Sequence, residues 1–335
     1  MDLLNKLSET VAQYQPTVVF SEGSDDRIIS ACKKIVEKKL SKKIFLIGNE
    51  NLIIEKLRSN NIHSEIISIV EPAKSDKLSK YAQTMMELRP ADFENIDKAK
   101  EKTLNSLYYG TLMHHEGIAD IHITGAVETS ADVIRAMYHI IKPNRKEGVT
   151  TSFFLMEKKE TDSVSNKVLF LSDCAVNIAP NPKMISRIAF QIGNIAKNIF
   201  NFDAKVALLT YSTKGSGSGE PVDHIIEAGQ ELKKLNPEFI FEAEMQADAA
   251  IVPGISQRKA PGNMIGGQAN VFIFPDLQSG NIAYKLMQHL GNMHAYGPVL
   301  VGLNKTASDL SRGCSIEDIY GTFLVTAFYH IKKKA

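Results

Sequence analysis

Short apolar runs alternate with segments of helical periodicity along most of this 335-residue chain, and that alternation limits the possible folds more than any other feature. The runs at 17–20, 43–48 and 119–124 predict buried strands, and each leads into a segment with the spacing of a helix. A strand–helix repeat of this kind is typical of an α/β fold with a mostly parallel sheet. Further predicted strands are 65–70, 151–156, 167–172, 205–211, 247–252, 269–274 and 296–303; predicted helices are 4–14, 51–59, 75–88, 95–115, 130–142 and 279–290, one ending near Lys38, and two beginning near Pro182 and Pro221.

A charged, turn-rich segment at 143–150 separates two such alternating sets and predicts a domain boundary. We assign 1–147 together with 296–335 to one α/β domain, which carries the C-terminal loop and helix, and 148–295 to a second α/β domain. In the second domain, the polar segment 157–166 predicts an exposed hairpin turn. Ligands of open α/β sheets bind beyond the carboxyl ends of the strands, so the polar loops after the strands are the candidate sites.

Composition excludes several classes of protein. The net charge is +1, which gives no electrostatic basis for binding nucleic acid, and no apolar run is long enough to span a membrane. Three scattered cysteines argue against a disulfide framework, and the nine histidines lack the spacing of metal ligands, so we predict no metal. The N-terminal segment lacks the pattern of a signal peptide, and we expect a cytoplasmic protein with no nucleic-acid or membrane partner.

The segment 304–318 is polar and leads into a helix whose apolar residues recur at helical spacing. Ser315 stands at the expected N-cap, so the loop before it lies at a helix N-terminus, where free N–H groups and the helix dipole favour an anion. Arg312 adds a guanidinium that can hold phosphate through two hydrogen bonds. The same residues allow a structural interpretation, in which Ser315 and Asp318 form a capping box, Arg312 is a surface cation and Cys314 is an inert buried thiol.

A second loop, 211–219, joins a predicted strand to a predicted helix and is rich in glycine and serine. Its N–H groups and hydroxyls suit an anion, although it matches neither the P-loop nor the dinucleotide-binding pattern, and a flexible connector is the alternative. Arg89 and Arg135 each stand among less charged neighbours, where a solvated surface arginine is the default. Asp173 and Cys174 follow a strand as a catalytic pair would, and a buried structural thiol is the plainer interpretation of Cys174.

Taken in order, these loops resemble those of the phosphate acetyltransferase (phosphotransacetylase) family over essentially the whole chain, in its short form without the N-terminal regulatory region. The most specific pieces are Gly302-Leu-Asn-Lys305 with Asp309-Leu-Ser-Arg-Gly-Cys-Ser315, and Asn270-Val-Phe-Ile-Phe-Pro-Asp276 with Gly280-Asn281. The other matching pieces are Ser172-Asp-Cys-Ala-Val-Asn177, Tyr211-Ser-Thr with Gly215-Ser-Gly-Ser-Gly219, and Glu22-Gly-x-Asp-x-Arg27. Thr306, Ser172 and Ala247 depart from the usual residues, and these changes bear on acyl preference rather than on the reaction.

The resemblance implies two α/β domains with an active cleft between them, of the isocitrate/isopropylmalate-dehydrogenase type, and a homodimer. It implies interconversion of acetyl-CoA and phosphate with acetyl phosphate and CoA, with CoA as a substrate and no tightly bound cofactor. By match to the family motif, Ser311, Arg312 and Asp318 are expected to be catalytic, and Arg89 and Arg135 to help bind CoA and acetyl phosphate. Further substrate-binding residues are expected in the matching polar loops: Ser130, Thr213, Ser216, Ser218 and Asn304.

For the chemistry, we expect Asp318 to act as base toward the CoA thiol, Arg312 to bind the phosphoryl or carbonyl oxygen, and Ser311 to donate a hydrogen bond to it. Direct attack of the thiolate on acetyl phosphate in a ternary complex is preferred over an acyl-enzyme on Cys314 or Cys174. Three alternatives remain open: a phosphate butyryltransferase or other phosphate acyltransferase, an NAD(P)-dependent decarboxylating dehydrogenase on the same fold, and a non-catalytic protein that kept the scaffold.

Overall fold

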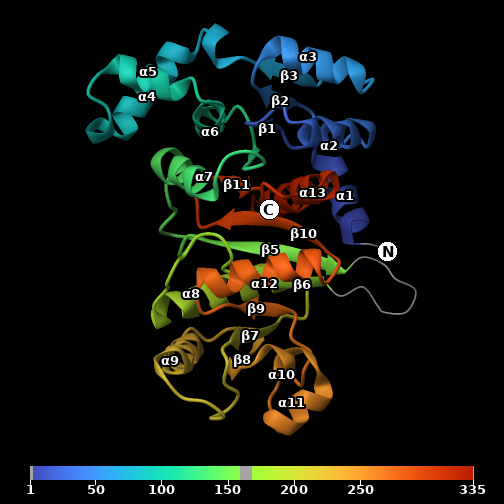
Figure 1. Cartoon of the computed structure of the whole chain (residues 1–335), viewed down its shortest axis with the longest axis vertical. Helices are drawn as coiled ribbons and strands as arrows, with labels where there is room; N and C mark the ends of the chain where they lie inside the picture. Colours follow the sequence, from blue (N-terminus) through green and yellow to red (C-terminus); the bar gives the residue numbers. More distant parts are fainter. Residues whose placement is uncertain (1–2, 159–167, 335) are drawn as a thin grey trace. The chain divides into compact units, whose positions relative to one another are not determined.

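The chain divides into two compact units in the computed structural model, which describes residues 3–158 and 168–334. The first unit is Met1–Asn144 with Leu303–Ala335, and the second is Arg145–Gly302. Figure 1 shows the elements of both units, coloured along the chain. Each unit builds helices around its own group of hydrogen-bonded strands, as the alternation of the sequence predicts.

The strands of the first unit are all parallel and lie in the order β3-β2-β1-β4-β11. The strand order reverses between β1 and β4, and ligands of open α/β sheets bind beyond the carboxyl ends of the strands at such a switch point. The strands are β1 Val18–Phe20, β2 Ile44–Ile47, β3 Ile67–Val70, β4 Ile121–Thr124 and β11 Thr306–Asp309. The helices are α1 Leu3–Tyr14, α2 Asp26–Glu37, α3 Glu50–Ser59, η1 Pro72–Lys74, α4 Leu78–Leu88, η2 Pro90–Asp92, α5 Ile96–Thr103, α6 Ser106–Glu116, α7 Ser130–Ala136 with the π-helix η3 Met137–Ile141, and α13 Ile316–Lys334.

Helix α13 is buried on every side from Asp318 to Ile331, although the sequence predicted a single apolar stripe. It packs against α1, α2, β4 and β11, which cover more of its surface than one sheet face would. Polar residues on this helix are tolerated because they have partners: the hydroxyls of Ser308 and Thr326 lie 2.6 Å apart, and Thr326 also donates to the carbonyl of Thr322.

The prediction that 304–314 is one polar loop was wrong, because this segment contains strand β11. This strand reads Thr-Ala-Ser-Asp and lacks the apolar pattern by which buried strands are found. It is nevertheless buried and pairs in parallel with β4. Partners such as Thr326 replace water around its hydroxyls, so the strand can be buried without apolar side chains.

The second unit has a mixed set of strands in the order β10-β5-β6-β9-β7-β8. The pairs β10–β5 and β5–β6 are antiparallel, and the remaining pairs are parallel. The strands are β5 Thr151–Lys158, β6 Val168–Ser172, β7 Lys205–Leu209, β8 Ile240–Met245, β9 Val271–Ile273 and β10 Met293–Val301. The helices are α8 Pro182–Asn194 with the π-helix η4 Ile195–Ile199, α9 Glu220–Lys234, α10 Ala247–Ile251, α11 Pro253–Lys259 and α12 Leu277–His289.

Other predicted elements also differ from the structure. The predicted strand 247–252 is helix α10, and the strand of this region is β8 just before it, whose charged residues weaken the apolar signal. The predicted helix 95–115 is two helices, because Asn105 accepts the N–H groups of Leu107 and Tyr108 and starts α6. In the predicted hairpin turn 157–166, the first two residues belong to β5, and 159–166 lie outside the described residues. The predicted α/β class with mostly parallel strand pairing is confirmed.

Candidate functional site

Three loops of the first unit follow neighbouring strands at the switch point and are tied to one another. They follow β1, β4 and β11, which are adjacent in the sheet. The N–H of Leu310 donates to the carbonyl of Thr124 at 2.6 Å, which joins the loop after β11 to the loop after β4. The carboxylate of Glu22, after β1, accepts the N–H of Gly125 at 2.7 Å and the hydroxyl of Thr124 at 3.1 Å. The polar loops that the sequence places after these strands therefore form one connected cluster.

Arg27 connects the loop after β1 to the other two loops. Its Nη1 donates to the carbonyls of Arg312 and Cys314, at 2.7 and 3.2 Å, and its Nη2 donates to the carbonyl of Ala126 at 2.7 Å. Asp25, the N-cap of α2, holds the guanidinium from the other side through a bidentate pair at 2.9 and 3.0 Å. The sequence match contained Arg27 but gave it no role, because a contact across 285 positions of the chain leaves no local signal.

Ser315 and Asp318 form a capping box at the start of α13. The Asp318 carboxylate accepts the N–H of Ser315 at 2.9 Å and its hydroxyl at 2.8 Å, while the N–H of Asp318 donates to Ser315 Oγ at 3.1 Å. The structural interpretation of this pair is therefore confirmed, with Asp in place of the usual Glu or Gln. Asp318 is buried, with 4% of its surface exposed. Its carboxylate lies close to Cys314, where its charge raises the pKa of the thiol.

Arg312 differs from the other arginines considered for the site. Its backbone carbonyl is bound by Arg27, but its exposed guanidinium makes no hydrogen bond or ion pair within residues 3–158 and 168–334. Next to it, Ser311 Oγ accepts the N–H of Gly313 at 3.3 Å, which leaves the hydroxyl proton of Ser311 without a recorded acceptor in the same described part of the chain. The loop thus presents a cation and a hydroxyl donor from a backbone that is held in place.

Both cysteines that were considered as acyl carriers are buried thiols. Burial raises the pKa of Cys314 to about 12, although the charge of Arg27 lowers it. Burial also raises the pKa of Cys174 well above its ordinary value, and Asp173 adds to the rise. A thiol with a raised pKa supplies little thiolate at neutral pH, so neither group is prepared as a nucleophile.

A buried pair of carboxyl groups beneath these loops was missed by the sequence interpretation. Asp309 ends β11 with 1% of its surface exposed, and one of its oxygens lies where a side chain on Gly125 would have to be. Burial raises the pKa of Asp309 to about 7, the Ser130 side chain lowers it, and the charge of Glu22 raises it. Burial likewise raises the pKa of Glu22. Neither oxygen of Asp309 has a hydrogen-bond partner of good geometry among the described residues.

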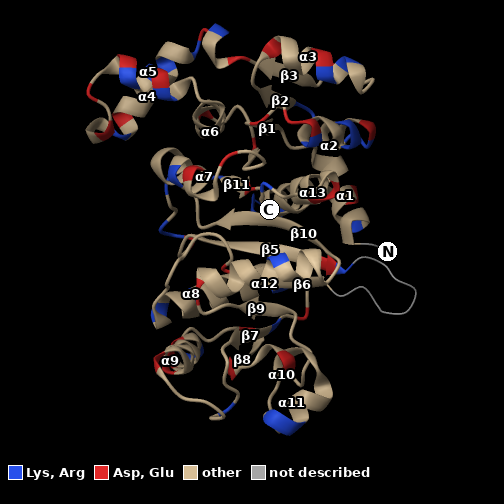
Figure 2. Cartoon of the chain, in the orientation of Figure 1, with Lys and Arg blue, Asp and Glu red and all other residues tan. Residues whose placement is uncertain are grey.

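Arg89 and Arg135 lie on the surface of the first unit, each paired with a nearby aspartate. Arg89 binds Asp92 in a bidentate pair at 2.8 and 3.1 Å, and Arg135 binds Asp132 at 2.7 Å. The charges of both arginines lower the pKa of His139, after the larger effect of burial, so they act on a common neighbour. Basic and acidic residues are interspersed over the helices of this unit in Figure 2.

The remaining predicted binding residues of the first unit lie at two places. Ser130 is the first residue of α7 and faces the cluster through Asp309. Asn304 donates from Nδ2 to the carbonyls of Ile141 and Lys142, at 3.0 and 3.2 Å, so it ties the start of the C-terminal segment to the end of η3. Both of these contacts of Asn304 are structural.

In the second unit, the loop 211–219 is folded around the buried carboxylate of Glu244. Oε1 of Glu244 accepts the hydroxyl of Ser212 at 2.7 Å and the N–H of Gly215 at 2.5 Å. Thr213 receives a hydrogen bond from the N–H of Gln246, and its own N–H donates to Ser216 Oγ. The carbonyl of Ser218 accepts the hydroxyl of Tyr211. The loop is an ordered turn rather than a flexible connector, and several of its donors already have partners.

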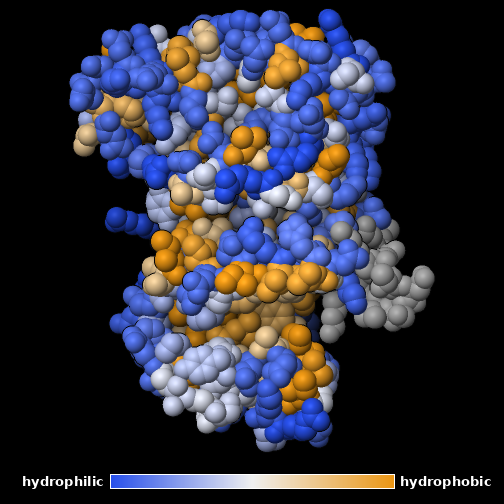
Figure 3. Space-filling view, in the orientation of Figure 1, coloured by the Kyte–Doolittle hydropathy of each residue, from blue (hydrophilic) through white to orange (hydrophobic). Residues whose placement is uncertain are grey.

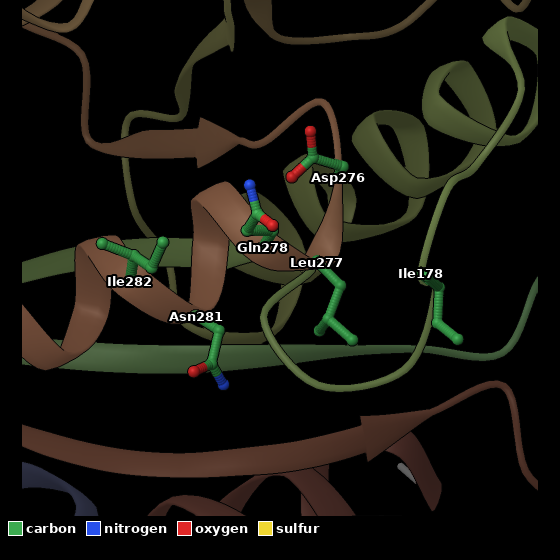
Figure 4. A pocket seen from close by; sticks show the side chains of 6 residues that line it. All are labelled: Ile178, Asp276, Leu277, Gln278, Asn281 and Ile282. Carbon is green, nitrogen blue, oxygen red and sulfur yellow. The ribbon is translucent and has the colours of Figure 1, made fainter.

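A hollow of about 510 Å³ in the second unit lies between the loop after β6 and the start of α12. Figure 4 shows its lining, which is Ile178, Asp276, Leu277, Gln278, Asn281 and Ile282. Asp173 organises the neighbouring loop by accepting the N–H groups of Ala175, Val176 and Asn177. The preferred interpretation of Cys174 as a buried thiol is confirmed, and the carboxylate of Asp173 is bound by the loop backbone and Ser152.

Comparison with known proteins identifies the family. The profile described as "Phosphate acetyl/butaryl transferase" matches residues 2–327. The chain belongs to this family. It is therefore an acyltransferase, and the resemblance stated from its motifs is confirmed. It is 38% identical to the phosphate acetyltransferase of Bacillus subtilis over 97% of this chain and 98% of that protein.

Solved structures agree with this assignment. A phosphotransacetylase from Streptococcus pyogenes superimposes with a TM-score of 0.86 at 35% identity, covering 98% of each chain. A branched-chain phosphotransacylase from Enterococcus faecalis gives a TM-score of 0.67 at 19% identity, over 95% of this chain and 99% of that one. At that identity the second likeness shows the fold alone.

The described residues contain no group of three His, Cys, Asp or Glu side chains arranged to hold a metal ion. None of the helices within 3–158 and 168–334 combines the length and apolar character needed to cross a membrane.

Proposed function

We propose that this enzyme interconverts acetyl-CoA and phosphate with acetyl phosphate and CoA, by direct attack of the CoA thiolate on acetyl phosphate in a ternary complex. One observation carries the proposal: Arg312 presents an unpaired guanidinium from a fixed loop, beside the Ser311 hydroxyl and before a helix N-terminus, within the described part of the chain. A dianionic phosphoryl group is the ligand that such a set of donors suits. The choice of acetyl as the acyl group and of phosphate as its acceptor is supported by the relatives at 35–38% identity, which are described as phosphate acetyltransferase and phosphotransacetylase.

In the proposed reaction the thiolate sulfur forms a bond to the acetyl carbon while the bond from that carbon to the phosphate oxygen breaks. Negative charge develops on the carbonyl oxygen as the sulfur attacks. When the carbonyl re-forms, phosphate departs with the electron pair of the broken bond. Arg312 binds the oxygen on which charge grows, and Ser311 donates a hydrogen bond to it. Because acetyl phosphate already carries a good leaving group, alignment of the two substrates supplies much of the rate acceleration.

Asp318 is the proposed base for the CoA thiol, and its capping box offers a direct test. Asp318→Asn keeps a side-chain oxygen that can accept from Ser315 but removes the base, so kcat is expected to fall about 10²–10³-fold while KM for acetyl phosphate changes little. Ser315→Ala is the matched control, since it removes the cap hydroxyl and leaves the carboxylate, at a cost of about 1 kcal/mol in the free energy of unfolding. Equal losses of kcat in both variants would assign Asp318 to helix capping alone.

Steady-state kinetics of thioester formation from acetyl phosphate and CoA test the direct route. A ternary complex gives intersecting double-reciprocal lines, and Cys314→Ala is expected to keep kcat within about twofold because the buried thiol carries no acyl group. Parallel lines, together with an acetylated enzyme that disappears in the Cys314→Ala or Cys174→Ala variant, would establish the acyl-enzyme route instead. Competition between acetyl and butyryl phosphate in the same assay decides between an acetyl- and a butyryltransferase.

Arg89 and Arg135 are proposed to bind the phosphates of CoA and acetyl phosphate. Each is paired with an exposed aspartate, and exposed pairs of this kind stabilise a protein by less than about 1 kcal/mol. A substrate phosphate can therefore displace the aspartate at little cost. Ser130 and Asn304 of the first unit, and Thr213, Ser216 and Ser218 of the second, are proposed to contribute further polar contacts to the substrates.

We also propose that the enzyme is a homodimer, as the family resemblance implies. Support comes from α12 and its C-cap Leu290, where Ile282, Leu286 and Leu290 are 52%, 52% and 82% exposed at a spacing of four residues. Figure 3 shows this apolar band along α12. Apolar side chains gathered on one face of a helix are typical of a surface that another chain covers. A sedimentation mass of a single chain at micromolar concentration would contradict the dimer.

A further inference from the structure

The Glu22–Arg27 motif belongs to the sequence match, and the proposed chemistry leaves it without a role. Arg27 adds a cation to the site, and its number of unused N–H donors determines whether it can bind a substrate. A guanidinium has five N–H donors. In Arg27, Nε and Nη2 bind the two oxygens of Asp25, Nη2 also binds the carbonyl of Ala126, and Nη1 binds the carbonyls of Arg312 and Cys314. These five contacts use every donor, so Arg27 has none left for a phosphate.

The two carbonyls bound by Nη1 belong to the residues on either side of Gly313. This glycine is exposed, and a Cβ added to it would meet only Ser311 Oγ, at 3.9 Å, so its surroundings restrict the turn very little. The turn is closed locally by the hydrogen bond from the N–H of Cys314 to the carbonyl of Ser311 at 2.9 Å. From outside the loop, Arg27 binds the backbone of Arg312 itself.

Asp25 and Glu22, two acidic residues of the same motif, also help to hold the loops in place. Asp25 is at once the N-cap of α2 and the bidentate partner of Arg27, so the guanidinium is anchored to a helix of 12 residues. Glu22 fixes the loop after β4 through Gly125, while Arg27 reaches the carbonyl of Ala126 in the same loop. The motif therefore holds two loops, after β4 and after β11, from one rigid base.

We propose that Arg27 is a positioning residue that acts through Arg312: by binding the carbonyls of Arg312 and Cys314, it holds the backbone from which the Arg312 guanidinium reaches the phosphoryl group. The inference rests on the function proposed above. Misplacement of a catalytic group by about 1 Å can lower a rate about 10²-fold, so a loss of this anchor would be visible in turnover. A direct substrate role for Arg27 predicts a different result, because its loss would then add to the loss of Arg312.

The test is a double-mutant cycle between Arg27→Gln and Arg312→Ala on the full-length enzyme. Arg27→Gln alone is expected to lower kcat at least about 10-fold and to leave KM for CoA within about twofold, since no donor of Arg27 contacts substrate. In the Arg312→Ala background the same change is expected to have almost no further effect on kcat, because the group that it positions is gone. A loss that multiplies with that of Arg312→Ala, or a kcat equal to that of the wild type, overturns the inference.

Lys34→Gln is the matched control. Lys34 lies on α2 like Arg27, has a similar side-chain exposure of 35% against 29%, and reaches the same C-terminal segment by pairing with the side chain of Glu317 rather than with the loop backbone. It is expected to retain wild-type kcat. If Arg27→Gln fails to fold, Arg27→Lys takes its place in the cycle, since a single ammonium cannot reproduce the planar fork that binds several carbonyls. An unchanged kcat in Arg312→Ala alone would refute the proposed function, whereas a low kcat there with a normal kcat in Arg27→Gln would refute only this inference.

Discussion

Replacing Arg312 with alanine is expected to lower kcat for thioester formation about 10²–10³-fold, the loss that follows removal of a donor aimed at developing negative charge. The unfolding free energy is expected to change little, because the guanidinium is exposed and makes no hydrogen bond or ion pair within the described residues. The backbone contact to Arg27 comes from the carbonyl and is kept in the alanine variant. Arg312→Ala is therefore expected to lose activity while keeping the unfolding free energy of the wild type.

Two further variants decide how the guanidinium acts. Arg312→Lys keeps the charge but loses the planar fork, so its kcat should fall between those of the wild type and Arg312→Ala. Arg58→Ala removes an exposed arginine from α3 of the same unit and controls for the change in net charge. If Arg312→Ala and Arg58→Ala have the same kcat and the same KM for acetyl phosphate, Arg312 is a surface cation and the proposed phosphoryl site is wrong.

The strand–helix alternation predicted the α/β class because buried parallel strands are apolar and short, and the sequence shows this directly. It failed for β11, whose residues are polar and yet buried; the hydroxyl of Ser308, for example, is paired with that of Thr326. A hydropathy pattern registers the side chains of a strand and says nothing about the partners that make their burial possible. The same limit explains why 304–314 was predicted to be one loop.

Local sequence patterns likewise predicted some features of the candidate site and missed others. Local patterns found Ser315 as a cap and placed Arg312 in the loop before a helix, because capping depends on residues three apart. They could not reveal that the donors of Arg27 are all used, since its contacts to the loop after β11 join segments nearly 300 positions apart. Nor could they reveal that the guanidinium of Arg312 has no hydrogen-bond or ion-pair partner among the described residues. They also could not find the carboxyl pair of Glu22 and Asp309, because burial of a charged residue is a property of the folded chain.

Asp309 leads to the second prediction of large effect, a loss of stability as the pH rises. The pKa of this carboxyl is raised by burial from 3.8 to about 7 in the folded protein. Between about pH 4 and pH 7 the unfolded chain has released the proton and the folded chain still holds it, so raising the pH favours unfolding. The shift corresponds to a penalty on the order of 4 kcal/mol that is absent below pH 4 and fully developed above pH 7.

The Asp309→Asn variant isolates this effect, because an amide of similar shape does not ionise. Groups facing Asp309 are Glu22, whose pKa is also raised by burial, the Ser130 side chain, and the backbone of Gly125 and Leu310. Buried His114 and His122 have lowered pKa values, so their effect on stability has the opposite sign: they favour the folded protein as the pH rises.

The measured quantity is therefore the difference in unfolding free energy between Asp309→Asn and the wild type, from urea titrations at pH 5, 6, 7 and 8 (about one pH unit apart, to span the titration). That difference should grow in favour of the variant up to about pH 7 and then level off, and a difference that does not vary with pH would show that Asp309 is ionised throughout in the folded enzyme.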